Sequence, residues 1–418
     1  MKMNKKVLII GAGVIGLHCA FYLNENGFEV EVLEALPEND ETACSYGNCG
    51  LLVPSHFVPL ASPAMLHSGF KMLFDRKSPV YLPVGRNLQH IPWFLKFMKA
   101  ANQKQVNHVI PTLYKLNEES RNLYKELSLI SDNKTKFEHS GMLMVSATEK
   151  GFEEETKVAG IATGLGIETT ILDNAALKAA EPEVDFKARG AVLYKSDGQI
   201  DPVEHMRWLK KYLKNKGVVF HFETAVLEIS VVKGKISGVK TNRGEFSADE
   251  YVLATGSFSS ALADSLGISI PVISGKGYSI DFPKSELKLH TPLILTEAKV
   301  AITPFDNRIR LGSGMEFNGN VGEVRLQRVQ AMLDNTNKVL PQFAGKNASE
   351  LTIWEGLRPV TPSGVPFVGR TKKYPELLVA AGHAMMGVSL GPVTGKIISQ
   401  LIAGEPTGFD MHLLHPDC

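Results

Sequence analysis

The chain has 418 residues, a formal net charge of +1, 44% hydrophobic residues and 21% charged residues. This length is too great for one ordinary hydrophobic core and predicts about two or three domains. A near-neutral chain without a basic block interleaved with aromatic residues is not typical of nucleic-acid binding. Four scattered cysteines do not make a disulfide scaffold.

The N-terminal segment predicts a βαβ unit. Residues 5–10, KKVLII, are typical of a buried strand, and GAGVIG then leads into a helical pattern that ends at Gly27. FEVEVLE follows as a second strand. A strand, a Gly-rich turn, a helix and a second strand within about 30 residues predict a parallel sheet.

The apolar N-terminal run superficially resembles a signal peptide because lysines precede it. Three glycines interrupt the run, no A-x-A-like cleavage site follows it, and Glu29, Glu31 and Glu34 come soon after it. Elsewhere no uninterrupted stretch of about 20 apolar residues predicts a membrane span. We therefore expect a cytoplasmic protein with at most peripheral contact with the inner face of the membrane.

The GAGVIG turn fits a dinucleotide-binding fingerprint. Gly11 would allow the tight turn, Gly13 would let the backbone approach a pyrophosphate, and Gly16 would let helix and strand pack closely. The helix N-terminus would offer N–H groups and a positive dipole to the phosphates. Glu34, 18 residues after Gly16, would accept hydrogen bonds from ribose hydroxyls. The structural alternative is a Gly-rich turn in an unrelated α/β fold.

Further along, residues 92–127 predict two helices divided at Pro111. Asp201 as N-cap and Pro202 at the first helical position predict the start of another helix. Residues 377–404 predict a strand, a loop and a helix that ends near Gly404. The βαβ-like pieces at the start, middle and end of the chain predict a discontinuous cofactor domain with a second domain inserted between its pieces.

We expect the cofactor domain to comprise residues 1–60, 195–262 and 350–418, and the substrate-binding domain to comprise residues 61–194 and 263–349.

The fingerprint alone does not distinguish NAD from FAD. FAD is favoured because the chain lacks the regular six-strand alternation of a plain NAD domain. The apolar strand at residues 251–254 also ends in Thr255 and Gly256, small residues that would let it approach a dinucleotide from the other side of the sheet. An ordinary strand-to-turn junction is the alternative for these two residues. An NAD-dependent dehydrogenase and a non-catalytic flavin-binding protein are the alternatives for the whole chain.

Six stretches in the same order resemble the D-amino acid oxidase superfamily of flavoproteins, and most closely its bacterial D-amino acid dehydrogenases. They are GAGVIG with Glu34, SYGNCGLLVPS, ATGSFSS, GKGYSI at 275–280, GLRPVTPSGVPFVGR at 356–370 and AAGHAMMGVSLGPVTGKII at 380–398. The resemblance implies an α/β fold with an FAD-binding Rossmann-like domain of the GR2 type. Its inserted α+β substrate domain would be built on a mostly antiparallel sheet.

The resemblance also implies which residues hold FAD. The fingerprint residues would bind the ADP half, and Val226 would lie by the adenine end. The residues bordering the flavin would be Ser45, Gly47, Asn48, Cys49, Gly50 and Leu51, with Gly387, Ser389, Leu390, Gly391 and Thr394 at the pyrimidine edge. A helix N-terminus at that edge would stabilise the negative charge of the reduced flavin.

Four candidate residues would meet the substrate. Arg358, in GLRP, would form a bidentate clamp on an amino-acid carboxylate, with Tyr278 adding a hydroxyl to the same carboxylate. His56 and His383 would line the pocket, and the structural alternative for all four is an ordinary packed or ion-paired side chain. Some glycine oxidases carry an arginine where this chain has Met385-Met386, which favours a more apolar pocket here.

The implied reaction is oxidative deamination of a D-amino acid. A hydride would pass from Cα to flavin N5, and the imino acid would hydrolyse to a keto acid. The acceptor of the electrons would be a quinone, O2 or another carrier. Oxidation of cis-4-hydroxy-D-proline, or of glycine or sarcosine, is the alternative within the superfamily.

The loop TACSYGNCGLL at residues 42–52 contains Cys44 and Cys49. A metal site is not expected because no further ligands accompany the two thiols. Relatives with covalent flavin attach it through a C-terminal region where this chain has no cysteine before Cys418, so we expect noncovalent FAD. The small residues would let backbone N–H groups reach the ring and its phosphates.

Overall fold

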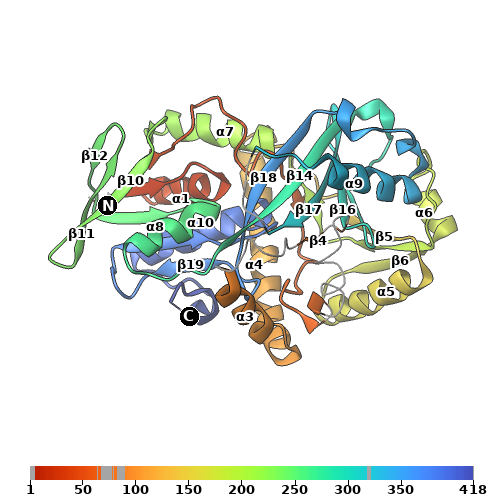
Figure 1. Ribbon diagram of the computed structural model, residues 1–418, viewed down its shortest axis with the longest axis horizontal. Coiled ribbons are helices and arrows are strands. Elements are labelled where there is room, and N and C mark those ends of the chain that lie inside the picture. The colour runs from red at the N-terminus through yellow and green to blue at the C-terminus, as the bar shows by residue number, and fades with distance from the viewer. Residues whose placement is uncertain are drawn as a thin grey trace.

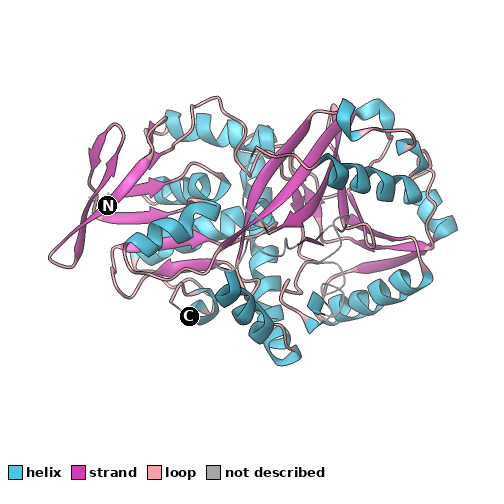
Figure 2. Ribbon diagram, in the orientation of Figure 1, coloured by secondary structure: helices cyan, strands magenta, loops and turns pink. Residues whose placement is uncertain are grey.

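The computed structural model describes residues 5–63, 65–66, 78, 80–81, 90–317 and 322–417 (Figure 1). Two large sheets organise these residues, one in each half of the molecule in the view of Figure 2. Helices cover the outside of both sheets, and the N- and C-terminal segments lie in the same half.

The first sheet contains six strands within the described residues. Their order is β19 (Phe367–Arg370), β20 (Leu377–Ala381), β13 (Glu250–Leu253), β1 (Lys6–Ile10), β2 (Glu29–Leu33) and β9 (Val219–His221). All neighbours are parallel except β19 and β20. The predicted βαβ unit is therefore confirmed, and its strand β1 lies between β13 and β2 in the sheet.

Successive residues of these strands are buried on opposite faces of the sheet. Val7 and Ile9 pack with helices on one face, whereas Leu8 and Ile10 face the other core. The first face is covered by α1 (Val14–Glu25), α4 (Gln103–Ile130), α7 (Pro202–Asn215) and α10 (Gly387–Ala403). The second face is covered by α8 (Ser259–Ser265) and the antiparallel β10 (Val226–Val232), β11 (Lys235–Thr241) and β12 (Gly244–Phe246). This makes three layers.

The second sheet is mostly antiparallel. Among the described residues its order is β18 (Ile353–Val360), β14 (Ile273–Pro283), β17 (Arg308–Glu316), β16 (Val300–Pro304), β15 (Leu293–Leu295), β5 (Met142–Ser146), β7 (Gly190–Tyr194) and β6 (Thr169–Asp173), with β4 (Val80–Tyr81) beside β17. Only the pairs β15–β5 and β17–β4 are parallel. The mixed α/β architecture and the mostly antiparallel second sheet agree with expectation.

The remaining elements connect or cover these sheets. They are β3 (Leu51–Leu52) paired with β8 (Gly198–Gln199), the helices α3 (Ile91–Ala100), α5 (Glu149–Gly164), α6 (Asn174–Ala180), α9 (Leu326–Val339) and α11 (Met411–Leu414), and short 3-10 turns at Gly256–Phe258, Lys284–Glu286, Pro341–Phe343 and Ala348–Glu350.

The predicted helix break at Pro111 was wrong. Pro111 lies inside the continuous helix α4, and the break between α3 and α4 falls at Ala101 and Asn102. Asn102 begins α4 as its N-cap, since its side chain accepts a 3.0 Å hydrogen bond from the Gln105 amide. The start of α7 is as predicted, because Asp201 caps the amide of Val203 at 2.9 Å.

Two segments, α4 and β18, do not lie in the domains that the sequence pattern predicts for them. α4 packs in one core with α1 and α10, although the sequence pattern predicts residues 61–194 in the substrate-binding domain. β18 pairs with β14 in the second sheet, although the sequence pattern predicts residues 350–418 in the cofactor domain. The chain therefore crosses between the two halves more often than the sequence pattern indicates.

Among the described residues, no helix is both long enough and apolar enough to cross a membrane.

Candidate active site

The fingerprint turn is held by close backbone contacts. Gly11 has a φ of +104°, and a Cβ there would lie 2.7 Å from the carbonyl oxygen of Ala254 at the end of β13. A Cβ at Gly16 would overlap the carbonyl oxygen of Gly11. At Gly13, however, a Cβ would meet only the Ser45 hydroxyl, at 3.6 Å. The protein itself thus requires glycine at Gly11 and Gly16, whereas Gly13 leaves room for a ligand.

Two polar side chains complete this turn. Glu34 accepts a 2.7 Å hydrogen bond from the Ala12 amide and a 2.9 Å bond from the Leu36 amide. Ser45 accepts a 3.0 Å bond from the amide of Val14, the first residue of α1. Both side chains therefore satisfy amides of the segment that would receive the phosphates and the ribose.

The segment from Ser45 to Leu51, here called the flavin loop, lies between the two sheets. The Asn48 side chain donates to the Met385 carbonyl at 3.1 Å and accepts from the Gly50 amide at 2.7 Å. Gly50 has a φ of +68°, and a Cβ there would overlap the Ile200 carbonyl. The flavin loop is therefore tied to the turn before α10 and to the chain before α7.

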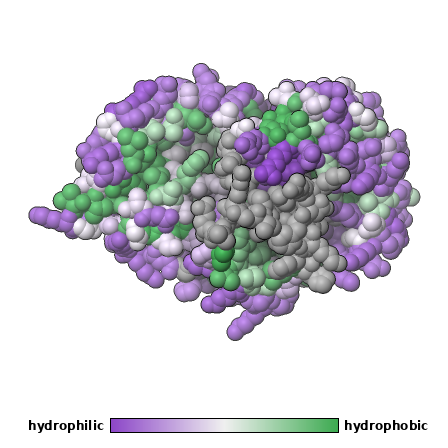
Figure 3. All heavy atoms as spheres, in the orientation of Figure 1, coloured by the Kyte–Doolittle hydropathy of each residue, from purple (hydrophilic) through white to green (hydrophobic). Residues whose placement is uncertain are grey.

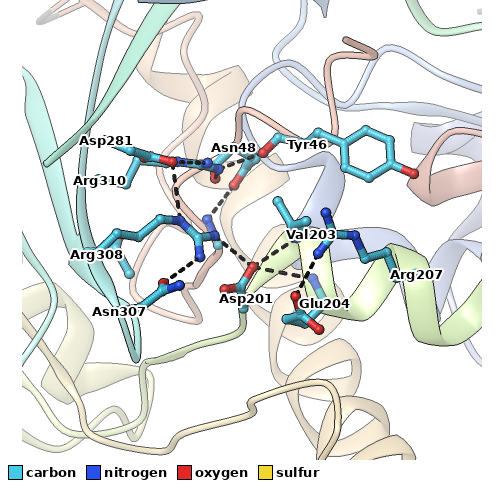
Figure 4. Close-up of polar contacts among 12 residues, drawn as sticks. Tyr46, Asn48, Asp201, Val203, Glu204, Arg207, Asp281, Asn307, Arg308 and Arg310 are labelled. Atoms are coloured by element: carbon cyan, nitrogen blue, oxygen red, sulfur yellow. Dashed lines mark hydrogen bonds and ion pairs between the residues drawn. The ribbon is translucent and has the colours of Figure 1, made fainter. Parts of the chain in front are cut away.

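An ion-pair network fixes the flavin loop to the second sheet (Figure 4). Arg310 pairs with Asp281 through two nitrogens, at 2.7 and 2.8 Å. Its Nη1 also donates to the carbonyls of Tyr46 and Asn48, at 2.5 and 2.9 Å. Arg308, two residues earlier on β17, joins Asp281 to Asp201, the cap of α7, as Figure 4 shows.

Glycines cover the face of the second sheet that lies beneath the flavin loop. Directly opposed residues of an antiparallel pair share a face, so Arg358 lies on the same face as its partner Gly275 and as Gly277. A Cβ at Gly277 would overlap the Arg358 guanidinium. On neighbouring β17 a Cβ at Gly312 would overlap the Cys49 sulfur. Glycines therefore give both the guanidinium and the flavin loop room to approach the sheet.

Arg358 has no carboxylate partner among the described residues. Its Nη1 donates to the carbonyl of Gly314, and Cys44 and Cys49 lie close enough to raise its pKa slightly. Burial lowers the pKa of the guanidinium below its ordinary value, but an arginine remains protonated at neutral pH. A desolvated cation without a counter-ion suits an anionic ligand.

Tyr278 is not brought together with Arg358. Alternation along β14 puts it on the opposite face of the sheet from Gly277. Its hydroxyl donates to Glu316 at 3.2 Å, and burial, followed by the Glu316 charge, raises its pKa. The expected contact with the same carboxylate as Arg358 does not fit this orientation.

The two predicted pocket histidines are both uncharged. Burial lowers the pKa of His383 to about 3 and, with a smaller contribution from Lys299, that of His56 to about 4. His383 Nε2 lies 2.9 Å from the Thr394 hydroxyl, so it connects the turn before α10 to that helix. Nδ1 of His56 has no hydrogen-bond partner within the described part of the chain.

The start of α10 lies beside the flavin loop. Ser389 accepts a 3.2 Å bond from the Val53 amide and donates to Asn117 at 2.9 Å. The remaining predicted residues of this group, Gly387, Leu390 and Gly391, form the first turns of α10, where a Cβ at Gly391 would lie 2.5 Å from the ring of His18.

On the other side of the fingerprint, the Thr255 hydroxyl lies 3.1 Å from that of Ser259, and Gly256 has a φ of +57°. Val226 begins β10, two residues after Thr224, whose amide donates to the Glu34 carbonyl at 2.8 Å. The predicted cofactor residues therefore gather around the fingerprint, the flavin loop and the start of α10.

Cys19, Cys44 and Cys49 are free thiols. Burial raises the pKa of Cys44, and that of Cys49 to about 11, so neither is a reactive thiolate at neutral pH. No group of three or more potential ligands that could hold a metal ion occurs among the described residues.

Sequence reasoning missed Arg310 and Trp354. Arg310 is the second of two arginines in a strand, RIRLGSG, and no local pattern distinguishes it from a surface residue. The Trp354 indole packs where Cβ atoms at Gly47 and Gly356 would otherwise lie. An aromatic residue two positions before a glycine in a strand was the available signal for this packing.

The comparisons with known proteins agree with this geometry. The sequence matches the family described as FAD dependent oxidoreductase (DAO) over residues 6–401. It is 30% identical over 401 residues to a D-amino acid dehydrogenase of Helicobacter pylori (strain ATCC 700392 / 26695), covering 96% of this chain and 95% of the relative.

Among solved structures, glycine oxidase from Geobacillus kaustophilus superposes with a TM-score of 0.76 at 21% identity, covering 99% of this chain and 98% of that chain. L-proline dehydrogenase from P. horikoshii superposes with a TM-score of 0.73 at 19% identity, covering 100% of this chain and 98% of that chain. At these identities the likeness concerns the fold.

The chain belongs to the family of FAD-dependent oxidoreductases. The predicted family, fold class and cofactor are confirmed, and the NAD alternative is set aside. The residues fit FAD on their own geometry, because the fingerprint turn leaves Gly13 open and the start of α1 lies beside the flavin loop.

Proposed function

We propose that this protein is a D-amino acid dehydrogenase that oxidises the Cα–N bond of a D-amino acid with noncovalently bound FAD. The product is an imino acid that hydrolyses to a keto acid, and a quinone or another carrier takes the electrons. The observation that carries the proposal is Arg358, a partly buried cation without a carboxylate partner in the described residues. The identity to D-amino acid dehydrogenases supports the substrate class.

Arg358 would bind the substrate carboxylate. Its guanidinium can form two parallel hydrogen bonds, which fix the orientation of the carboxylate as well as its position. The bond to the Gly314 carbonyl holds the guanidinium, and Gly277 leaves space for it against the sheet. Fixing one end of the substrate limits the positions that its Cα–H can take, which is the main catalytic contribution open to these residues.

The bound flavin would supply the redox chemistry by accepting a hydride equivalent from Cα. The substrate amine must be neutral when this happens, so no strong base is essential. The two predicted pocket histidines would suit such a site, because His56 and His383 are uncharged at neutral pH and would not repel a substrate ammonium group as it loses its proton. Met385 and Met386, at the turn before α10, favour an apolar side chain over glycine as substrate.

A membrane-resident quinone is the electron acceptor that the surface favours. Helix α3 exposes Ile91, Leu95 and Met98 by 48%, 56% and 44%, and their spacing puts them on one side of the helix. Figure 3 shows hydrophobic surface where α3 lies, at the lower edge of the view. Lys96 and Lys99 are the charged residues of α3, which suits contact with an anionic lipid surface.

The inner side of α3 is anchored. The Trp93 indole donates to the carbonyls of Pro271 and Val360, at 3.1 and 3.2 Å. Val360 is the last residue of β18, two residues after Arg358. A peripheral membrane contact through α3 would therefore lie close in structure to the strand that carries the substrate clamp.

Two measurements test the proposed function. Purified protein should be yellow, and under anaerobic conditions D-amino acids should bleach the flavin absorbance while their L-enantiomers should not. Glycine, sarcosine and cis-4-hydroxy-D-proline belong in the same screen, because bleaching by only one of these would replace the proposal with the corresponding alternative. Reoxidation by a quinone analogue that is faster than reoxidation by O2 would support a dehydrogenase over an oxidase.

A further inference from the structure

We propose that Arg310 is a positioning residue that orients two backbone amides of the flavin loop, those of Gly47 and Cys49, toward the bound flavin. The inference rests on the proposed role of this loop beside the cofactor. Arg310 itself would touch neither flavin nor substrate. Its effect would pass through the carbonyl oxygens that it binds.

Burial and a bidentate ion pair hold the side chain of Arg310 in place. The residue is only 6% exposed, and Asp281 holds two of its nitrogens. Burial alone would lower the pKa of Arg310, but the pairing with Asp281 raises it. The arginine is therefore a fixed charged donor, and Figure 4 shows it directed at the backbone between Tyr46 and Asn48.

Peptide geometry converts these contacts into a direction for the amides. In a planar trans peptide, the C=O of one residue and the N–H of the next point in opposite directions. Because Arg310 binds the carbonyls of Tyr46 and Asn48, the N–H groups of Gly47 and Cys49 point away from it. They therefore point away from the strand β17 that carries Arg310.

Both amides are available to a ligand. The Asn48 amide donates to the Ser45 carbonyl and the Gly50 amide to the Asn48 side chain. In the described part of the chain, by contrast, no acceptor is found for the amides of Gly47 and Cys49. Gly47 is buried, and a buried amide without an acceptor is costly, which favours a ligand atom as its partner.

A second side chain of the same sheet, Thr303, also binds a backbone carbonyl of the flavin loop. The Thr303 hydroxyl, on β16, donates to the carbonyl of Cys49 at 2.7 Å. Three carbonyls of the flavin loop, those of Tyr46, Asn48 and Cys49, thus bind side chains of the second sheet. These three carbonyls therefore face the second sheet, whereas the N–H groups of Gly47 and Cys49 point in other directions.

Arg308 provides a matched control for Arg310. It lies on the same strand and pairs with the same Asp281, but its other polar partners are Asp201 and Asn307 and no flavin-loop carbonyl. A lysine at either position keeps the charge but loses the planar fork. Lysine at 310 cannot bind a carboxylate through two nitrogens and two carbonyls at once, so Arg310→Lys should release the loop.

The first experiment compares FAD dissociation constants of wild type, Arg310→Lys and Arg308→Lys, measured by flavin fluorescence. We expect binding about tenfold weaker or worse for Arg310→Lys, which corresponds to the loss of about one net hydrogen bond, and a change under about threefold for Arg308→Lys. The visible spectrum of the bound flavin should change in Arg310→Lys alone. Equal affinities and spectra in the two variants would overturn the inference.

A second experiment does not depend on either variant folding. The chain has four cysteines, so selective labelling with ¹⁵N-cysteine gives at most four amide signals, and Cys49→Ala assigns that of Cys49. Adding FAD to the wild-type apoprotein should shift the Cys49 signal strongly downfield, as a new hydrogen bond does, and shift that of Cys19 much less. A Cys49 signal that moves no more than the Cys19 signal would overturn the inference.

Failure of this inference is distinct from failure of the proposed function. The dissociation constants, flavin spectra and amide shifts require FAD but no substrate. If the wild type binds FAD and no D-amino acid bleaches it, the substrate proposal fails and the role of Arg310 is still decided by these readouts. If D-amino acids bleach both the wild type and Arg310→Lys and the two bind FAD equally, only the role of Arg310 fails.

Discussion

The Tyr124 hydroxyl donates a 2.6 Å hydrogen bond to the carbonyl oxygen of Val388. Within α10 that carbonyl would normally receive the amide of the residue four positions later, but this residue is Pro392, which has no N–H. Tyr124, fully buried on α4, supplies the donor that the helix lacks. The link explains how a proline is accommodated in the helix that begins beside the flavin loop.

Removing this hydroxyl should destabilise the protein. Tyr124→Phe would leave the Val388 carbonyl buried without a donor, at a cost of about 1–3 kcal/mol in the free energy of unfolding. Urea denaturation of the two proteins measures the difference. Tyr212→Phe is the control, because Tyr212 bonds Glu25 at the surface, at 3.1 Å. Equal losses in the two variants would contradict the role given to Tyr124.

The fingerprint glycines should separate protein stability from cofactor binding. Gly13→Ala introduces a Cβ that meets no protein atom closer than 3.6 Å, so the unfolding temperature of the apoprotein should hardly change while FAD binding weakens at least about tenfold. Gly16→Ala should destabilise the apoprotein itself, because its Cβ overlaps the Gly11 carbonyl. A Gly13→Ala protein that binds FAD like the wild type would refute the close approach of the ligand.

Arg358→Ala should impair substrate use and leave the flavin bound. Losing two charge-assisted hydrogen bonds, each contributing about 1.5–3 kcal/mol, should lower kcat/KM by about 10² or more, mainly through KM. Steady-state kinetics with a dye acceptor measure this. Arg243→Ala, which removes a surface guanidinium paired with Glu223, is the control. A KM within about threefold of wild type would remove the clamp.

Stability should fall on acidification below about pH 6.5. Burial keeps His18, His56, His205 and His383 neutral, with pKa values of about 4 for His56 and about 3 for His205 and His383. Unfolded chains protonate these rings near pH 6.5, so between that pH and the folded pKa values the unfolded state binds more protons and gains stability. Burial raises the pKa of the Asp197 carboxyl to about 7, so below that pH the folded state binds one proton that the unfolded chain does not. This offsets the effect of one histidine.

The pH dependence of urea midpoints between pH 7.5 and 5 tests this expectation. His205→Gln should reduce the slope by up to about 1.4 kcal/mol per pH unit, the value for one proton. His108→Gln, which replaces an exposed histidine of α4, should leave the slope unchanged. A slope that is the same in all three proteins would show that the buried histidine is not responsible.

The exposed side of α3 should bind anionic membranes. Wild-type protein should sediment with vesicles of phosphatidylglycerol and phosphatidylcholine, and the double variant Leu95→Glu, Met98→Glu should not, because it adds like charge and removes apolar contact. Leu129→Glu is the control, since Leu129 is 78% exposed at the end of α4. Loss of sedimentation in the control as well would point to a general charge effect.

The sequence predicted the features in which nearby backbone atoms restrict which residue can occupy a position. Gly11 and Gly16 have to be glycine because carbonyl oxygens occupy the Cβ positions, and such positions recur with fixed spacing. Asp201 was identifiable as a cap because its partners are two and three residues away. Such local constraints involve residues that are close in sequence, so a short sequence pattern is enough to predict them.

The parts that it missed depend on which strands become neighbours. Tyr278 and Gly277 are adjacent in sequence, but only strand alternation against β18 decides which one shares a face with Arg358. Arg310 acts on carbonyls more than 250 positions earlier in the chain, and backbone carbonyls carry no sequence signal. Pro111 misled because an N-cap nine residues earlier, Asn102, set the real boundary.

The strand order of the first sheet has a consequence for synthesis of the chain. Among the strands of this sheet, β1 is synthesised first. Its neighbour β13 begins only at Glu250, and β20, which pairs with β13, begins only at Leu377. Until then the apolar edge of β1 lacks its native partner, which exposes the nascent chain to mispairing and gives chaperones a long interval in which to act. The helix α10, which begins at Gly387, is synthesised later still, so the predicted flavin-binding residues come together only after most of the described chain has been made.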